Sequence, residues 1–222
     1  MTYKINEVFF SIQGEGESLG FPAVFIRFSG CNLKCSFCDT SHEFHEVLTA
    51  KQIARRVRSA LAEKLWPQSL DHIPLRCVFT GGEPLMQLSN EIADEIKTLG
   101  FSLCIETNGT IVPDDFDWGL YDEVVVSPKS PNGVSDKILE RATCLKVVVP
   151  LMQSRSVVKY MSANGPRLRS RVLQPILPRE GFHSWKWTDN CLDAKHLAMA
   201  WLRDRQEEWR VIPQAHASMG LK

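Results

Sequence analysis

Three closely spaced cysteines are the side chains most suited to chemistry. Cys31, Cys35 and Cys38 follow a C-x3-C-x2-C spacing. Thiolates are soft ligands that select zinc, copper(I) or iron–sulfur clusters, and three of them in one short loop can bind a single inorganic centre. A structural zinc ion needs a fourth ligand, which His42 or His45 could supply. A cubane iron–sulfur cluster held by three cysteines instead leaves one iron open for a substrate or cofactor, and redox-active thiols are the third alternative.

The remaining cysteines favour a reducing compartment. The total of seven is odd, and the first residues show no basic segment followed by an apolar stretch and a small-residue cleavage site. We therefore expect a cytoplasmic location, where clustered cysteines bind metals or react more often than they form disulfides. Four cysteines lie within or beside apolar runs, and we expect them to be buried core residues without a chemical role: Cys77, Cys104, Cys144 and Cys191.

Short strands alternating with helices must position the cysteine loop. Apolar and β-branched runs predict strands, and apolar residues at helical spacing predict three helices. This alternation indicates βαβ units with a mostly parallel sheet and helices outside it. Because the chain is short for a full eight-fold barrel, we expect an incomplete TIM-like α/β barrel. The predicted strands are 23–28, 75–79, 102–105, 123–126, 145–149 and 171–173, and the predicted helices are 49–67, 84–100 and 192–205.

Unusual polar segments follow most of these strands. The carboxyl ends of parallel strands lie on one side of a sheet, so we expect these segments to converge around a single pocket. They are residues 29–39, Thr80-Gly81-Gly82-Glu83-Pro84, Glu106-Thr107-Asn108-Gly109, Ser127-Pro128-Lys129 and Gln174-Pro175.

Composition excludes several classes of partner. The chain has 222 residues, and 26 basic side chains balance 26 acidic ones. A protein that binds nucleic acid or an anionic membrane usually carries a basic excess. The sequence also has no apolar run long enough to span a membrane and no fixed-period repeat. We expect a small-molecule partner, with no nucleic acid and no membrane.

The cysteine loop and the glycine-rich segment together resemble the radical S-adenosylmethionine (SAM) superfamily. Its signature is a C-x3-C-x2-C loop after the first strand of a partial barrel, and Thr80-Gly81-Gly82-Glu83-Pro84 matches its glycine-rich turn after the second strand. The resemblance implies a [4Fe–4S] cluster on Cys31, Cys35 and Cys38, whose open iron is chelated by SAM and which cleaves SAM to a 5′-deoxyadenosyl radical. The radical is then made at the cluster and SAM, so no side chain is expected to be catalytic. The implied SAM contacts are Phe37, Gly82, Glu106, Ser127, Pro128, Lys129, Gln174, Pro175 and Ile176.

A narrower resemblance links the chain to the 7-carboxy-7-deazaguanine synthase family of the queuosine (deazapurine) pathway. It rests on Glu7, residues 10–16 and 22–27, Asp39-Thr40 and the terminal Gln214-x-His216. The family converts 6-carboxy-5,6,7,8-tetrahydropterin to 7-carboxy-7-deazaguanine with loss of ammonia. Thr40 is implied as a ligand of Mg²⁺, a hard ion that needs few protein ligands. The implied substrate contacts are Ile12, Gln13, Gly14, Glu15, Arg27, Thr80 and His216, of which His216 could instead cap a terminal turn.

Two other functions stay open at this point. One is a glycyl-radical-enzyme activating protein of the same superfamily, and the other is a zinc-knuckle binding module without catalysis. For the deazaguanine synthase, the expected partners are an electron donor such as flavodoxin and a second copy of the chain in a homodimer. We expect one domain, with residues 1–22 as a substrate-binding extension, 23–150 as the core with the cluster loop, and 151–222 completing the pocket.

Overall fold

The computed structural model describes residues 1–41, 43, 45–62, 75–130, 133–149, 168–176, 187–205 and 208–220. The chain divides into two compact units. The first contains residues 1–12, 21–107 and 111–124, and the second contains residues 13–20, 108–110 and 125–222. The amino-terminal segment therefore contributes to both units. The predicted division at residues 22 and 150 stays a prediction.

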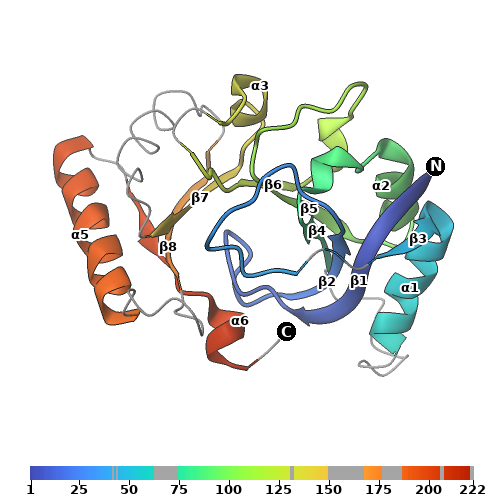
Figure 1. The fold of residues 1–222 in the computed structure, drawn as a ribbon, viewed down its shortest axis with the longest axis horizontal. Helices are drawn as coiled ribbons and strands as arrows, with labels where there is room; N and C mark the ends of the chain where they lie inside the picture. Colours follow the sequence, from blue (N-terminus) through green and yellow to red (C-terminus); the bar gives the residue numbers. More distant parts are fainter. Residues whose placement is uncertain are drawn as a thin grey trace. The chain divides into compact units, whose positions relative to one another are not determined.

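In the described part of the first unit, five strands lie in the order β3-β1-β2-β4-β5 (Figure 1). β1 pairs antiparallel with β2 and β3, whereas β2, β4 and β5 are parallel to one another. The three parallel strands were predicted, but β1 and β3 were not. Their bounds are Thr2–Ile12 for β1, Pro22–Phe28 for β2, Glu46–Thr49 for β3, Arg76–Gly81 for β4 and Ser102–Thr107 for β5.

Helix α1 (Ala50–Ala62) begins where its capping residues predict. The Thr49 hydroxyl accepts a hydrogen bond from the Gln52 backbone N–H (3.3 Å), and the Gln52 side chain accepts one from the Thr49 backbone N–H (2.8 Å). This reciprocal arrangement satisfies two amides that a helix start leaves unpaired. Ile53, Val57 and Leu61 form the buried face of the helix. The predicted end of this helix near Pro67 lies outside the described residues.

The single helix expected over 84–100 is wrong. The structure has a 3-10 helix, Pro84–Met86, and a separate helix α2, Asn90–Lys97. Gln87 and Ser89 leave the helical conformation between them. The Gln87 side chain donates to the Ser29 carbonyl (2.7 Å) and accepts from the Lys4 amide (2.8 Å). These tertiary bonds tie Gln87 to β1 and to the residue after β2, at the point where the helical backbone is interrupted.

The paired strands of the second unit are also parallel. The last two residues of β6 (Glu123–Val126) pair with β7 (Cys144–Val149), which pairs with β8 (Ser170–Pro175), and β8 pairs with β9 (Arg210–Val211). Helix α5 (Trp187–Arg205) lies against β8 and β9 (Figure 1). The described residues also form the short helices α3 (Asp136–Leu139) and α6 (Ala215–Ser218) and a 3-10 helix, Trp118–Leu120. Mostly parallel strands with intervening helices confirm the predicted class of incomplete α/β barrel.

Burial of the core cysteines follows the prediction with one exception. Cys77, Cys104 and Cys144 are buried in strands, and burial raises the pKa of the Cys77 thiol. The prediction of a core position is wrong for Cys191, which lies partly exposed on α5. None of the seven cysteines forms a disulfide. None of the helices in the described ranges is both long and apolar enough to cross a membrane.

Candidate active site

The three cysteines of the predicted cluster lie on the loop between β2 and β3. Cys31 and Cys35 are partly exposed, and Cys38 is exposed. The Cys38 amide donates to the Cys35 carbonyl (3.1 Å), which makes a tight turn between these two residues. In the part of the chain that the structure describes, no three His, Cys, Asp or Glu side chains surround one point as metal ligands. The loop thus offers three accessible sulfur donors that are not gathered at a common centre.

The glycine-rich turn packs directly on the start of this loop. The Gly82 amide donates to the Phe28 carbonyl (3.1 Å), and the Glu83 amide donates to the Gly30 carbonyl (3.0 Å). A Cβ atom on Gly82 would lie 1.9 Å from the Gly30 oxygen. Glycine is therefore required here because two backbone segments meet without room for a side chain. The contact fixes the first cysteine relative to the turn.

Glu83 joins the turn to the next strand. Its side chain is fully buried and accepts hydrogen bonds from the Leu85 amide (3.0 Å) and the Thr107 hydroxyl (2.8 Å). Nearby, the Thr80 hydroxyl donates to the Glu106 carboxylate (3.3 Å). The structure thus places the predicted substrate contact Thr80 beside the predicted SAM contact Glu106.

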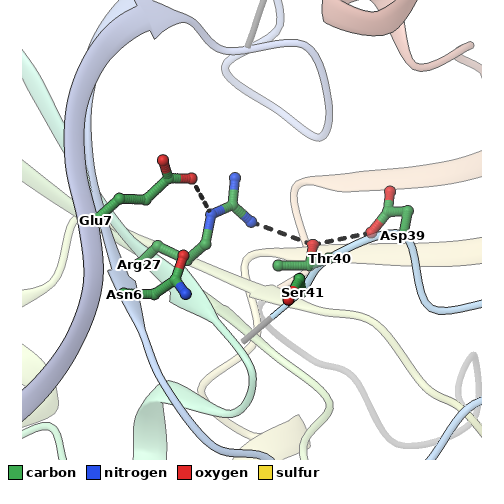
Figure 2. A pocket seen from close by; sticks show the side chains of 6 residues that line it. All are labelled: Asn6, Glu7, Arg27, Asp39, Thr40 and Ser41. Carbon is green, nitrogen blue, oxygen red and sulfur yellow. Dashed lines mark hydrogen bonds and ion pairs between the residues drawn. The ribbon is translucent and has the colours of Figure 1, made fainter. Parts of the chain in front are cut away.

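A pocket of about 310 Å³ surrounds Arg27 in the first unit. Figure 2 shows Arg27 extending from β2 between Glu7 and Thr40. The Arg27 Nε donates to Glu7 (2.8 Å), one terminal nitrogen donates to the Thr40 hydroxyl (3.1 Å), and that hydroxyl donates to Asp39 (3.0 Å). The guanidinium also lies 5.5 Å from the centre of the Phe9 ring. The pocket is lined by Asn6, Glu7, Arg27, Asp39, Thr40 and Ser41.

This chain of bonds orients a cation and a hydroxyl toward one space. Glu7 is opposite Arg27 in the β1–β2 register, beside a register shift between Ile5 and Glu7. An opposite-charge pair across two strands limits the conformations of both side chains. Sequence reasoning noted Glu7 and Asp39 only as parts of a motif. The structure adds the bonds that join Glu7 to Arg27 and Asp39 to Thr40.

The predicted substrate turn, residues 13–15, lies in the second unit and contacts the carboxyl-terminal segment. The Glu15 carboxylate accepts hydrogen bonds from Lys146 and from the Gln214 side chain (3.0 Å for the second). Burial raises the pKa of Glu15, but the Lys146 ammonium and these hydrogen bonds outweigh burial and lower it to about 2. A Cβ atom on Gly14 would lie 2.1 Å from Nδ1 of His216, so His216 packs on this turn.

Lys146 and Gln214 are the residues of this network that sequence reasoning missed. Lys146 lies inside an otherwise apolar strand, CLKVVV, whose residues are all buried. A charged residue at the centre of such a run is the signal that could have revealed it, because buried lysines are rare unless paired. Gln214 belongs to the terminal motif but had no role assigned to it.

The predicted SAM contacts of the second unit are mostly buried. The Lys129 ammonium donates to the Ser127 hydroxyl (2.8 Å), and Gln174 is 4% exposed. The Gln174 side-chain oxygen is buried without a hydrogen-bond partner. Pro128 and Pro175 are also buried. Ile12 and Phe37 lie in the first unit, so convergence of all the polar segments on one pocket stays a prediction.

Comparison with known proteins agrees with these features. Residues 25–142 match the radical SAM superfamily. The 7-carboxy-7-deazaguanine synthase of Bradyrhizobium diazoefficiens is 33% identical over 240 residues, covering 100% of both chains. That of Bacteroides thetaiotaomicron is 45% identical over 130 residues, or 58% of this chain and 62% of the relative. The crystal structure of QueE from Escherichia coli aligns with a TM-score of 0.69 and 27% identity, covering 97% of this chain and 95% of that one.

These relatives support an enzyme and do not support the zinc-knuckle module or the activating protein. Superfamily membership implies a [4Fe–4S] cluster and SAM as cofactors, together with a small-molecule substrate. The chain belongs to the radical SAM superfamily and, within it, to the 7-carboxy-7-deazaguanine synthase family of deazapurine biosynthesis.

Proposed function

We propose that the residues described above serve the ring contraction of 6-carboxy-5,6,7,8-tetrahydropterin to 7-carboxy-7-deazaguanine with release of ammonia. One observation carries this assignment of the site. Arg27 and Thr40 are hydrogen-bonded at 3.1 Å and line the same pocket. A guanidinium suits a carboxylate, and a hydroxyl beside a carboxylate suits Mg²⁺.

Cys31, Cys35 and Cys38 would hold the cluster. The donor set fits by its chemistry, because three thiols that form no disulfide lie on one short loop, none is buried, and the loop is anchored by the glycine-rich turn. When bound, the cluster supplies the electron that cleaves SAM and so provides the hydrogen-abstracting radical. The chain contributes placement of these groups.

Gln174 supports a SAM contact in the second unit. A buried amide oxygen without a partner costs free energy unless a donor reaches it, and a ligand amino group is such a donor. Lys129 and Ser127 would face anionic or hydroxyl groups of SAM. The full proposed set is Phe37, Gly82, Glu106, Ser127, Pro128, Lys129, Gln174, Pro175 and Ile176. For Gly82 the structure gives a second reason for glycine besides a SAM contact, because the Gly30 carbonyl occupies the space that a side chain would need.

The pterin carboxylate and Mg²⁺ would bind at Arg27 and Thr40. Glu7 and the Phe9 ring hold the guanidinium in place, which reduces the conformational cost of binding. Mg²⁺ completes its shell with water and substrate oxygens, so Thr40 can serve as its protein ligand with Asp39 holding the hydroxyl. Ile12, Gln13, Gly14, Glu15, Thr80 and His216 complete the proposed substrate set.

The proposal extends to partners and location. Exposed Leu192, Met199 and Leu202 on α5 support a contact with a second copy of the chain. Seven free cysteines support a reducing, cytoplasmic compartment. An electron donor of the flavodoxin type stays a prediction.

A product assay tests this function. The anaerobically reconstituted and reduced protein is incubated with carboxytetrahydropterin, SAM and Mg²⁺, and 7-carboxy-7-deazaguanine is quantified. Product formation supports the proposal. A colourless zinc protein that does not cleave SAM would overturn the enzyme assignment, and SAM cleavage without product would point to the activating-protein alternative.

A further inference from the structure

Lys146 and Glu15 form a charged pair in the interior of the second unit. Only 6% of the Lys146 side chain and 12% of the Glu15 side chain are exposed. Lys146 is in the middle of β7, where Leu145 and Val147 beside it are fully buried. An ion pair in such a place is costly to desolvate, and an apolar side chain would pack there at least as well. Such a pair adds little net stability over two apolar residues, although loss of one member alone is costly, so it calls for a further explanation.

The Glu15 carboxylate connects the substrate turn to the carboxyl-terminal segment. One oxygen accepts from Lys146, and the other accepts from the Gln214 amide at 3.0 Å. The Ala215 amide donates to the Gly14 carbonyl (3.1 Å), and His216 occupies the space that a side chain at position 14 would fill. Three successive carboxyl-terminal residues thus contact two successive residues of the turn.

The turn also has hydrogen bonds of its own. The Glu15 amide donates to the Gln13 side chain (3.2 Å), and the Gly20 amide donates to the Gln13 carbonyl (2.8 Å). These bonds shape residues 13–20 internally. The Glu15 side chain is tied to other elements by hydrogen bonds from Lys146 on β7 and from Gln214.

We propose that Lys146 is a positioning residue for substrate binding, which acts through Glu15 to hold residues 13–15 and 214–216 in one arrangement. This inference rests on the proposed function, in which residues 13–15 and His216 contact the pterin. Lys146 supplies a fixed cation at the base of the turn, and Glu15 transmits its position to Gln214. Among the described residues, Lys146 from β7 and His216 from α6 act electrostatically on Glu15.

The test compares Lys146→Met with Lys137→Met in the reconstituted holoenzyme. Lys137 is exposed on α3, so its substitution is a matched control. For Lys146→Met we expect the KM for carboxytetrahydropterin to rise about tenfold or more while kcat stays within about threefold, since only binding geometry is lost. SAM cleavage without pterin should keep the wild-type rate. Hydrogen exchange of the peptide containing Ala215 should accelerate.

Two outcomes would overturn the inference. One is a wild-type KM together with wild-type exchange at Ala215, and the other is an equal loss of kcat and of pterin-independent SAM cleavage. If Lys146→Met does not fold, the double variant Glu15→Gln/Lys146→Met removes both charges and avoids a buried unpaired carboxylate. Because Glu15 itself belongs to the proposed substrate set, exchange at Ala215 is the readout for that variant: faster exchange would support the inference, and wild-type exchange would refute it.

The exchange measurement separates this inference from the proposed function. If the wild-type protein makes no deazaguanine, the proposed function fails, and exchange at Ala215 still reports whether Lys146 holds the carboxyl-terminal segment. If the wild-type protein makes product and Lys146→Met leaves KM and exchange unchanged, only the inference fails.

Discussion

Replacing Glu15 with glutamine should destabilise the protein in a pH-dependent way. The Glu15 pKa is lowered from 4.5 to about 2, because the Lys146 ammonium and hydrogen bonds from Lys146 and Gln214 outweigh the effect of burial. A carboxyl whose pKa is lower in the folded state stabilises the fold above its unfolded pKa. That contribution is lost as pH falls through 4.5 toward 2.

The size of the effect follows from the pKa and from the buried pair. Lowering the pKa from 4.5 to about 2 corresponds to about 3 kcal/mol of unfolding free energy at neutral pH. Removing one member of a buried ion pair generally costs about 3–5 kcal/mol, which agrees. We therefore expect Glu15→Gln to lose about 3 kcal/mol at pH 7. The difference in unfolding free energy between wild type and variant should shrink by about 1.4 kcal/mol for each pH unit below the Glu15 pKa of the unfolded state.

Urea unfolding followed by tryptophan fluorescence measures this difference between pH 7 and pH 3.5. Every other titrating group is common to the two proteins, so the difference isolates Glu15. Glu17→Gln is the control, because Glu17 pairs with the exposed Arg169 at 3.2 Å and its loss should cost no more than about 1 kcal/mol. A Glu15→Gln effect as small as the control, or one constant down to pH 3.5, would refute the reasoning.

Three further substitutions test the first unit. Gly82→Ala should destabilise the fold by about 1–3 kcal/mol or more, because its Cβ would lie 1.9 Å from the Gly30 oxygen, and denaturant unfolding checks this. Glu7→Gln should change stability by less than about 1 kcal/mol, since the pair with Arg27 is partly exposed, but should raise the KM for the pterin in steady-state assays. Cys38→Ser should lower the iron content and the visible absorbance of the reconstituted protein, and full iron loading would remove Cys38 from the proposed ligand set.

The strands that carry the barrel could be predicted because they are buried runs bounded by glycine, proline or polar residues. β7 is buried at every position, and its apolar run is a direct signal. β1 was missed because seven of its 11 residues are only partly buried and its alternation, with Tyr3 and Ile5 inside, is interrupted by the register shift before Glu7. The division of the helix after Pro84 depends on bonds from Gln87 to distant strands, which local periodicity does not contain.

The parts of the candidate site that are marked by residue type and spacing could be identified from the sequence. Contacts between residues distant in sequence could not. The cysteine loop, the glycine-rich turn and Arg27 were all identified from motifs. The partner of Glu15 is 131 residues away, and its pairing depends on where β7 lies. The same holds for Gly82. It must be glycine because Gly30, which follows the neighbouring parallel strand, leaves no room for a side chain.

The two units contain similar ion pairs. Each places one cation beside one carboxylate at a residue of the proposed substrate set, Arg27 with Glu7 in the first unit and Lys146 with Glu15 in the second. In each pair one residue is proposed to contact the pterin, and the other holds that residue in place. The contacting side chain therefore loses less conformational entropy when the substrate binds. Loss of the holding member removes orientation and leaves the chemistry in place. Substitution of Glu7 or of Lys146 should therefore affect KM far more than kcat.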